Sequence, residues 1–146
     1  MLVREMKEAD LASICAIENE TFSAPWSEED FFKSFHDENN SYLVTEEDGK
    51  IVGYCGYWGI AGEGNIYNVA VKKEYRRQGV GFLMLCQLIK QARERGITSC
   101  TLEVRQSNEA AIRLYERLGF ESVGIRRGFY TKPPEDAVIM WLRSIQ

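Results

Sequence analysis

The sequence has 146 residues, of which 45% are hydrophobic and 27% are charged, and its formal net charge is −4. This length is enough to bury a core without disulfides or a metal, so we expect residues 1–146 to form a single domain. The first residues carry charge where a signal peptide needs apolar ones, and no apolar run approaches the roughly 20 residues of a membrane span. These features predict a cytoplasmic protein with no membrane partner.

Few side chains are available for metal or nucleophilic chemistry. The cysteines are widely spaced in apolar surroundings without a C-x-x-C pair, which favours buried thiols over a metal site or a disulfide framework. These four residues are Cys15, Cys55, Cys86 and Cys100. The single histidine, His36, stands in a polar stretch, and no G-x-S-x-G motif occurs. A Ser-His-Asp hydrolase is therefore excluded from the main interpretations.

The first half of the chain predicts strands on either side of two helices. Pro25 separates the helices, and Ser27 begins the second with a capping-box-like sequence. The dipeptide Asp48-Gly49 predicts a hairpin turn. The predicted elements are a strand at 2–6, helices at 11–22 and 27–35, and strands at 41–45, 51–60 and 65–71.

The second half predicts a crossover followed by a hairpin. A strand, turn, helix and strand between residues 65 and 105 predict a right-handed crossover that pairs parallel strands. Gly96 and Gly119 are expected to end the two helices, and Ser107 or Asn108 to cap the second. The predicted elements are helices at 80–95 and 108–118 and strands at 98–105, 120–127 and 137–142. With the early hairpins, this order predicts a mixed sheet with helices on both faces.

The turn at residues 76–81, Arg-Arg-Gln-Gly-Val-Gly, carries the strongest functional signal. The first N–H groups of a helix lack internal partners, and Gly79 and Gly81 allow an anion to come close. Four cations precede the helix, namely Lys72, Lys73, Arg76 and Arg77. A basic cluster on an acidic chain indicates an anionic ligand such as a pyrophosphate rather than nucleic acid. The alternative is a tight turn with a solvated basic rim. Neither a P-loop nor a dinucleotide-binding motif is present.

The predicted strand at 98–105 offers a candidate base. Alternation places Cys100, Leu102 and Val104 on one face and Glu103 on the other. Glu103 is either part of a solvated strand face or a partly desolvated carboxylate that acts as a general base. Tyr115, twelve residues later, lies on the inward-facing side of its predicted helix. It is either a core aromatic residue or a phenol that protonates a leaving group.

These motifs resemble the GNAT family of N-acetyltransferases. The pattern R-x-x-G-x-G at Arg76, Gly79 and Gly81 resembles the acetyl-CoA signature of that family. Further segments are similar to the subfamily that acetylates an alanine of a ribosomal protein, and the resemblance covers nearly the whole chain. They are Pro25-Trp26, Asn68–Val71, Leu102–Arg105, Ser107-Asn108, Ala110-Ala111, Leu114-Tyr115, Leu118–Phe120, Arg126-Arg127 and Glu135–Met140.

The resemblance implies the fold and the residues that carry the chemistry. It implies a three-layer α/β/α fold of mixed α/β class, whose mostly antiparallel sheet splays at a central parallel strand pair, between 69–71 and 102–105. Glu103 would accept a proton through water, and Tyr115 would donate one to the departing thiolate. The implied acetyl-CoA contacts are Val69, Ala70, Val71, Arg77, Gln78, Gly79, Val80, Gly81, Phe82 and Asn108.

The acceptor implied by the resemblance is the N-terminal alanine of protein eighteen of the small ribosomal subunit. An α-amine has a pKa of about 7.8 and a lysine about 10.4, so a modest carboxylate base suits the α-amine better. The acidic chain would attract such a basic peptide, with Trp26, Tyr67 and Tyr130 as walls of its site or as ordinary packing. Acetylation of a lysine or a small amine, and a non-catalytic CoA-binding protein, are the alternatives. We expect a monomer or weak dimer without direct nucleic-acid contact.

Overall fold

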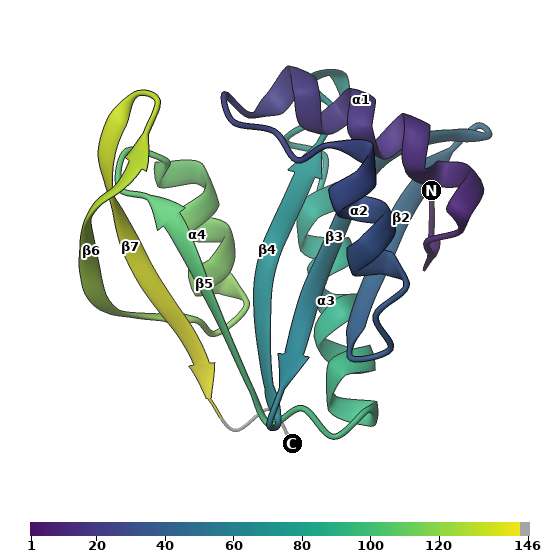
Figure 1. Ribbon diagram of the computed structural model, residues 1–146. Helices are drawn as coiled ribbons and strands as arrows, with labels where there is room; N and C mark the ends of the chain where they lie inside the picture. Colours follow the sequence, from purple (N-terminus) through teal and green to yellow (C-terminus); the bar gives the residue numbers. More distant parts are fainter. Residues whose placement is uncertain (144–146) are drawn as a thin grey trace.

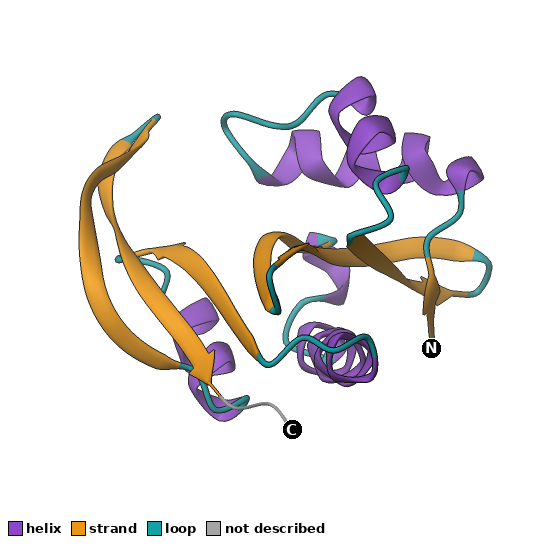
Figure 2. Ribbon diagram, turned by 60° about the horizontal axis from the view of Figure 1, so that its bottom comes forward, coloured by secondary structure: helices purple, strands orange, loops and turns teal. Residues whose placement is uncertain are grey.

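The computed structural model describes residues 1–143; the last three residues of the predicted domain lie outside this part. A single seven-stranded sheet has the order β1-β2-β3-β4-β5-β7-β6, with α1 and α2 on one face and α3 and α4 on the other (Figures 1 and 2). The strands are β1 (Leu2–Glu5), β2 (Asn40–Glu47), β3 (Lys50–Ile60), β4 (Glu63–Val71), β5 (Ser99–Arg105), β6 (Glu121–Thr131) and β7 (Pro134–Arg143). The helices are α1 (Leu11–Thr21), α2 (Glu28–Phe35), α3 (Val80–Glu94) and α4 (Glu109–Arg117). The predicted mixed α/β fold is confirmed.

The expected caps and turns set the limits of these elements. Ser27 and Asp30 form a capping box at α2, with Asp30 N donating to Ser27 Oγ at 3.1 Å and Ser27 N donating to Asp30 Oδ2 at 3.1 Å. Asn108, rather than Ser107, caps α4, because its Oδ1 accepts a hydrogen bond from the Ala111 amide at 3.2 Å. The short loops between strands and helices follow these local signals.

The sheet splays at its only parallel pair within residues 1–143. β4 and β5 are paired only where residues 63–65 face residues 99–101, and beyond this point the strands separate (Figure 1). β4 also carries a bulge: Gly56 pairs with Asn68 and Tyr57 pairs with Ile66, so Tyr67 has no partner on β3. A bulge adds a residue to one strand and re-aims its side chains. The predicted splay is confirmed.

Two apolar clusters hold the layers together on opposite faces of the sheet. Residues of α3, α4, β5 and β7 form the larger cluster, which includes the buried Met84, Leu85, Leu88, Leu102, Val104, Tyr115 and Met140. The second cluster joins α1 and α2 to β2 and β3 and includes Ile14, Ile17, Phe31, Tyr42, Val44 and Tyr54. Burying a large aliphatic side chain contributes about 1.5–3 kcal/mol. The clusters therefore fix both helical layers against a sheet whose halves diverge.

The cysteines belong largely to this interior. Cys15, Cys55 and Cys100 are buried and Cys86 is half-buried, all as free thiols. Burial raises the pKa of the Cys100 thiol to about 11, which keeps it protonated and unreactive near neutral pH. Among residues 1–143 no group of three or more His, Cys, Asp or Glu side chains is arranged to hold a metal ion. Over the same residues no helix is long and apolar enough to span a membrane.

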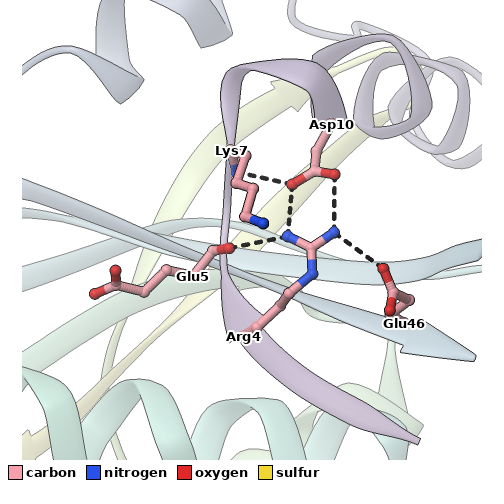
Figure 3. Close-up of polar contacts among 5 residues, drawn as sticks. All are labelled: Arg4, Glu5, Lys7, Asp10 and Glu46. Atoms are coloured by element: carbon pink, nitrogen blue, oxygen red, sulfur yellow. Dashed lines mark hydrogen bonds and ion pairs between the residues drawn. The ribbon is translucent and has the colours of Figure 1, made fainter. Parts of the chain in front are cut away.

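An ion-pair network joins β1 to the segment that leads into α1 (Figure 3). The guanidinium of Arg4 donates to both carboxylate oxygens of Asp10, at 2.8 and 3.0 Å, and to Glu46 Oε1 on β2 at 3.1 Å. The Lys7 amide donates to Asp10 Oδ2 at 2.7 Å. The hydrogen bond from Arg4 holds the pKa of the Asp10 carboxyl below its ordinary value, against the opposing effect of burial.

Candidate active site

Glu103 lies on β5 at the point where the sheet splays. Its neighbours Leu102 and Val104 are buried against α3 and α4, so strand alternation turns Glu103 to the face that carries α1 and α2. The Glu103 side chain is 19% exposed, and its Oε1 lies 3.5 Å from Nη1 of Arg126 on β6. It is therefore a half-buried carboxylate with one cationic partner.

Two of the predicted wall residues lie near this carboxylate. Burial raises the pKa of the Tyr67 and Tyr130 hydroxyls, and the negative charge of Glu103 raises both further, which places Glu103 within electrostatic reach of each ring. Tyr67 is the bulged residue of β4, and Tyr130 comes from the end of β6. Residues of β4 and β6 thus lie around Glu103 of β5.

An aromatic wall, which we define as Trp26, Trp58 and Tyr67, extends away from Glu103. The Trp58 and Tyr67 ring centroids are 4.8 Å apart, and those of Trp26 and Trp58 are 6.1 Å apart. The Trp26 amide donates to Glu18 Oε2 at 3.0 Å, which fixes the start of the segment leading into α2. Trp58 was not predicted as a site residue, because β3 is almost continuously apolar and shows no alternation that would assign its side chains to a face.

The turn between β6 and β7 is held next to this site. Arg105, two residues after Glu103, donates to the carbonyls of Lys132 and Pro133, each at 3.0 Å, and its guanidinium stacks on the Tyr130 ring at 4.2 Å. The Ser23 hydroxyl, from the loop between α1 and α2, donates to the Lys132 carbonyl. These bonds connect the two halves of the splayed sheet on the face that carries Glu103.

Tyr115 lies on the other face of the sheet. It is 8% exposed on α4 within the larger apolar cluster, and its ring packs on Phe120 at a centroid distance of 5.8 Å. Burial raises the pKa of its hydroxyl, so the phenol stays protonated at neutral pH and can act only as a proton donor. Glu103 and Tyr115 therefore approach the divergence of β4 and β5 from opposite faces of the sheet.

The start of α3 forms an anion cradle. The first intrahelical bond runs from the Leu83 amide to the Gly79 carbonyl at 3.0 Å, which leaves the amides of Val80, Gly81 and Phe82 without acceptors in the helix. Gly79 has φ of +81° and Arg77 has φ of +63°, and a Cβ on Gly79 would meet no atom within 4 Å. The turn is open to a ligand at Gly79.

Gly81 serves a different purpose from Gly79. A Cβ at Gly81 would meet Leu114 Cδ2 at 3.2 Å, so this glycine lets α3 approach α4. The sequence predicted both glycines as contacts of the anion, and the structure adds a packing reason for glycine at position 81 while leaving its amide without an acceptor in the helix. Phe82, next to it, lies under the Arg117 guanidinium at 4.5 Å.

Beyond the splay, the edge of β4 that faces β5 has unpaired backbone groups. The Lys72 amide donates to Val52 on β3 at 2.8 Å, so alternation turns the amides and carbonyls of Val69 and Val71 away from β3. The Val71 carbonyl accepts a hydrogen bond from Arg76 Nε at 2.8 Å, in line with that direction. The amide and carbonyl of Ala70 point toward β3, and its side chain is buried in the cluster with α1 and α2.

The remaining predicted cofactor residues flank this strand and cradle. Gln78 Nε2 donates to the Glu74 carbonyl at 3.1 Å, which braces the turn before Gly79. Asn108 uses its Oδ1 to cap α4 and keeps its amide N–H groups for other partners. Open strand amides followed by an open helix N-terminus suit an elongated ligand that has amide groups at one end and phosphates at the other.

Comparisons with known proteins agree with this arrangement. The sequence model of the Acetyltransferase (GNAT) family matches residues 11–120. The ribosomal protein bS18-alanine N-acetyltransferase of Escherichia coli K12 is 37% identical over 142 residues, which cover 96% of this chain and 95% of that protein. The protein of the same name from Haemophilus influenzae is 33% identical over 144 residues, covering 95% and 96%. The crystal structure of the ribosomal-protein-S18-alanine N-acetyltransferase from Escherichia coli has a TM-score of 0.90 at 36% identity, covering 98% of this chain and 93% of that one.

These matches confirm the predicted fold and the predicted enzyme class. The roles of single residues stay predictions that rest on the geometry above. The chain belongs to the GNAT family of acetyltransferases.

Proposed function

We propose that this enzyme transfers the acetyl group of acetyl-CoA to the N-terminal α-amine of a ribosomal protein, with the alanine of bS18 as the main acceptor. The observation that carries the proposal is the position of Glu103, a half-buried carboxylate at the splay that faces away from the cradle of α3. The names of the relatives, which are aligned over almost the whole chain, support the choice of acceptor.

Acetyl-CoA supplies an activated acetyl thioester, and the residues present fit it. The amides of Val80, Gly81 and Phe82 would hold the pyrophosphate, assisted by the partial positive charge of the helix start. The amides of Val69 and Val71, which point away from β3, would pair with the amide groups of the pantetheine arm of acetyl-CoA, as an added strand would. Arg77 and Gln78 would flank the phosphates.

The acceptor amine arrives from the face that carries Glu103. Glu103 accepts the proton that the ammonium must lose, directly or through water, and its partial exposure lets it return that proton to solvent. An α-amine has a pKa of about 7.8, so at pH 7 roughly 10–15% is already neutral, against less than about 0.1% of a lysine. A carboxylate of modest basicity therefore favours an N-terminal acceptor over a lysine.

Tyr115 serves the leaving group from the opposite face of the sheet. The phenol is protonated at neutral pH, and this proton would pass to the thiolate as the bond to the acetyl group breaks. Glu103 extends from β5 on one face of the sheet, and Tyr115 comes from α4 on the other. The two groups can then act in the same turnover on different reaction partners.

A comparison of two peptides tests the proposal. One peptide begins with a free alanine followed by basic residues; the other has the same sequence with a blocked N-terminus and an internal lysine. Release of CoA thiol and mass spectrometry of the product are expected to show acetylation of the free alanine only. Acetylation of the blocked peptide would move the enzyme to the lysine-modifying class, and activity on neither would point to a small amine.

A further inference from the structure

A chain of buried hydrogen bonds runs from the aromatic wall to the side chain of Asn68 on β4. Trp58 Nε1 donates to Ser34 Oγ at 2.9 Å, and Ser34 Oγ lies 2.7 Å from the Tyr42 hydroxyl. The Tyr42 hydroxyl donates to Asn68 Oδ1 at 3.2 Å. Ser34, Tyr42 and Asn68 are 6%, 5% and 3% exposed, so water does not compete for these bonds.

The number of donors fixes the direction of this chain. Ser34 Oγ also accepts a hydrogen bond from Asn40 Nδ2 at 3.1 Å. Trp58 Nε1 and Asn40 Nδ2 can only donate, so they occupy both lone pairs of the serine oxygen. The Ser34 hydroxyl must then donate its hydrogen bond to the Tyr42 oxygen. The Tyr42 hydroxyl in turn donates a hydrogen bond to Asn68 Oδ1. Burial raises the pKa of the Tyr42 hydroxyl, so this proton stays in place.

One end of the chain lies in the aromatic wall, and the other lies on β4 beside the first residue of the proposed cofactor edge. At one end the Trp58 ring packs on Tyr67 and Trp26, on the face that carries Glu103. At the other end Asn68 directly follows the bulged Tyr67 and precedes Val69, whose amide faces the cofactor side. A rotation of the Trp58 indole would break the first bond of the chain. Because buried polar groups are costly to leave unpaired, the chain holds the ring in one orientation.

We propose that Trp58 determines which N-terminal residues are accepted, by contacting the first side chains of the peptide, and that the Ser34 hydroxyl positions Trp58 for this role. This inference rests on the proposed function for the identity of the acceptor. Ser34 touches no substrate and acts only through the indole. A small first residue fits beside a fixed indole, whereas a freely rotating ring would admit larger ones.

Steady-state kinetics with Trp58→Phe test the first half of the proposal. Phenylalanine keeps an aromatic ring but lacks the N–H donor and part of the contact area. The KM for the free-alanine peptide is expected to rise about tenfold, as for the loss of one well-packed contact, with the Kd for acetyl-CoA unchanged. The preference for alanine over a peptide that begins with leucine is expected to fall. An unchanged KM and an unchanged preference would overturn the role of Trp58.

Ser34→Ala tests the second half, with Ser41→Ala as the matched control. Ser41 is also a buried serine, 8% exposed, but it bonds to Gln91 of α3 on the opposite face of the sheet. Both variants lose a buried hydroxyl, and only Ser34→Ala is expected to raise the peptide KM. In the double variant of Ser34→Ala and Trp58→Phe, the KM is expected to match that of Trp58→Phe alone. Additive effects would show that the serine does not act through the indole.

An NMR measurement separates this proposal from the proposed function. The indole N–H resonance of Trp58, assigned by its loss in Trp58→Phe, needs no acceptor. It is expected to exchange slowly with solvent in the native protein and to shift and exchange faster in Ser34→Ala. If Ser34→Ala shifts the resonance and speeds its exchange but the alanine peptide is not acetylated, the assignment of the acceptor fails. The role of Ser34 in positioning Trp58 is then still supported. A resonance unaffected by Ser34→Ala overturns the positioning role whatever the acceptor is.

Discussion

Arg126 Nη1 lies 3.5 Å from Glu103 Oε1, so the carboxylate proposed as the proton acceptor already has a cationic partner on β6. The Arg126 side chain is 55% exposed, whereas that of Glu103 is 19% exposed. The pair is therefore accessible to solvent and substrate from the side of Arg126. An incoming ammonium group would meet a carboxylate that is already paired, and would have to share it with the guanidinium.

Replacement of Arg126 should change acceptor binding more than chemistry. In Arg126→Met the ammonium no longer competes with a guanidinium, so the KM for a basic peptide is expected to fall about threefold to tenfold, as for removal of a partly exposed charge. Arg127→Met is the control, because Arg127 lies 4.0 Å from Asp136 and its side chain is 89% exposed. A higher KM in Arg126→Met would show that the arginine binds substrate instead.

Glu103→Gln removes the proton acceptor while keeping the shape of the side chain. Turnover at pH 7 is expected to fall by about 10²–10⁴-fold, with acetyl-CoA binding retained. The loss should shrink as the pH approaches the pKa of the amine, because more acceptor is then neutral without a base. Glu109→Gln, at an exposed position of α4, controls for the loss of a negative charge. Activity near the wild-type level at pH 7 would remove Glu103 from the mechanism.

Local sequence signals were sufficient for most of the fold. The capping box at Ser27, the Asp48-Gly49 turn, whose φ values are +52° and +78°, and the glycines after α3 and α4 act over a few residues. The position of β7 between β5 and β6 was not predicted, because strand order depends on pairing between distant segments. The last hairpin was also predicted too short, since β6 is exposed on both faces and lacks alternation.

The site was predictable where one segment carries it and not where distant segments meet. The cradle of α3 and the orientation of Glu103 follow from single stretches of sequence. The contacts of Glu103 with Arg126 and of Trp58 with Tyr67 join different strands, and no spacing in the chain indicates them. Ala70 was assigned with its neighbours by resemblance; its amide and carbonyl point toward β3, whereas those of Val69 and Val71 point toward the open edge.

Tyr115→Phe tests whether the buried phenol is a proton donor or only a packing residue. The ring stays in its apolar cluster, so the thermal midpoint should change little, while turnover falls because the thiolate leaves unprotonated. Since burial raises the pKa of this hydroxyl, wild-type turnover should not decline between pH 8 and about pH 10 through loss of its proton. Reduced thermal stability with full activity would assign the tyrosine to packing alone.

Gly79→Val tests the cradle, with Gly96→Val as a control at the other end of α3. Both glycines have positive φ, +81° and +86°, and a Cβ at either would meet no atom within 4 Å. Each variant should therefore lose a similar stability, about 1–2 kcal/mol, from strain in the left-handed region. Only Gly79→Val should weaken acetyl-CoA binding in calorimetry, because its side chain projects where the phosphates lie. Equal Kd values for the two variants would contradict the pyrophosphate assignment.

The Arg4–Asp10 pair should make stability depend on pH in acid. The pKa of Asp10 is lowered in the folded protein, so the unfolded chain binds more protons and stability rises with pH. The contribution is complete above the unfolded pKa of about 4 and is lost as the pH falls through the folded pKa. Asp10→Asn should cost about 1–3 kcal/mol in urea unfolding at pH 7, with a difference from wild type that shrinks as the pH falls below about 4. Glu29→Gln, in an exposed pair with Lys33, should change stability by less than about 0.5 kcal/mol. If the cost of Asp10→Asn is the same at pH 3 and pH 7, the pair stabilises β1 through shape rather than charge.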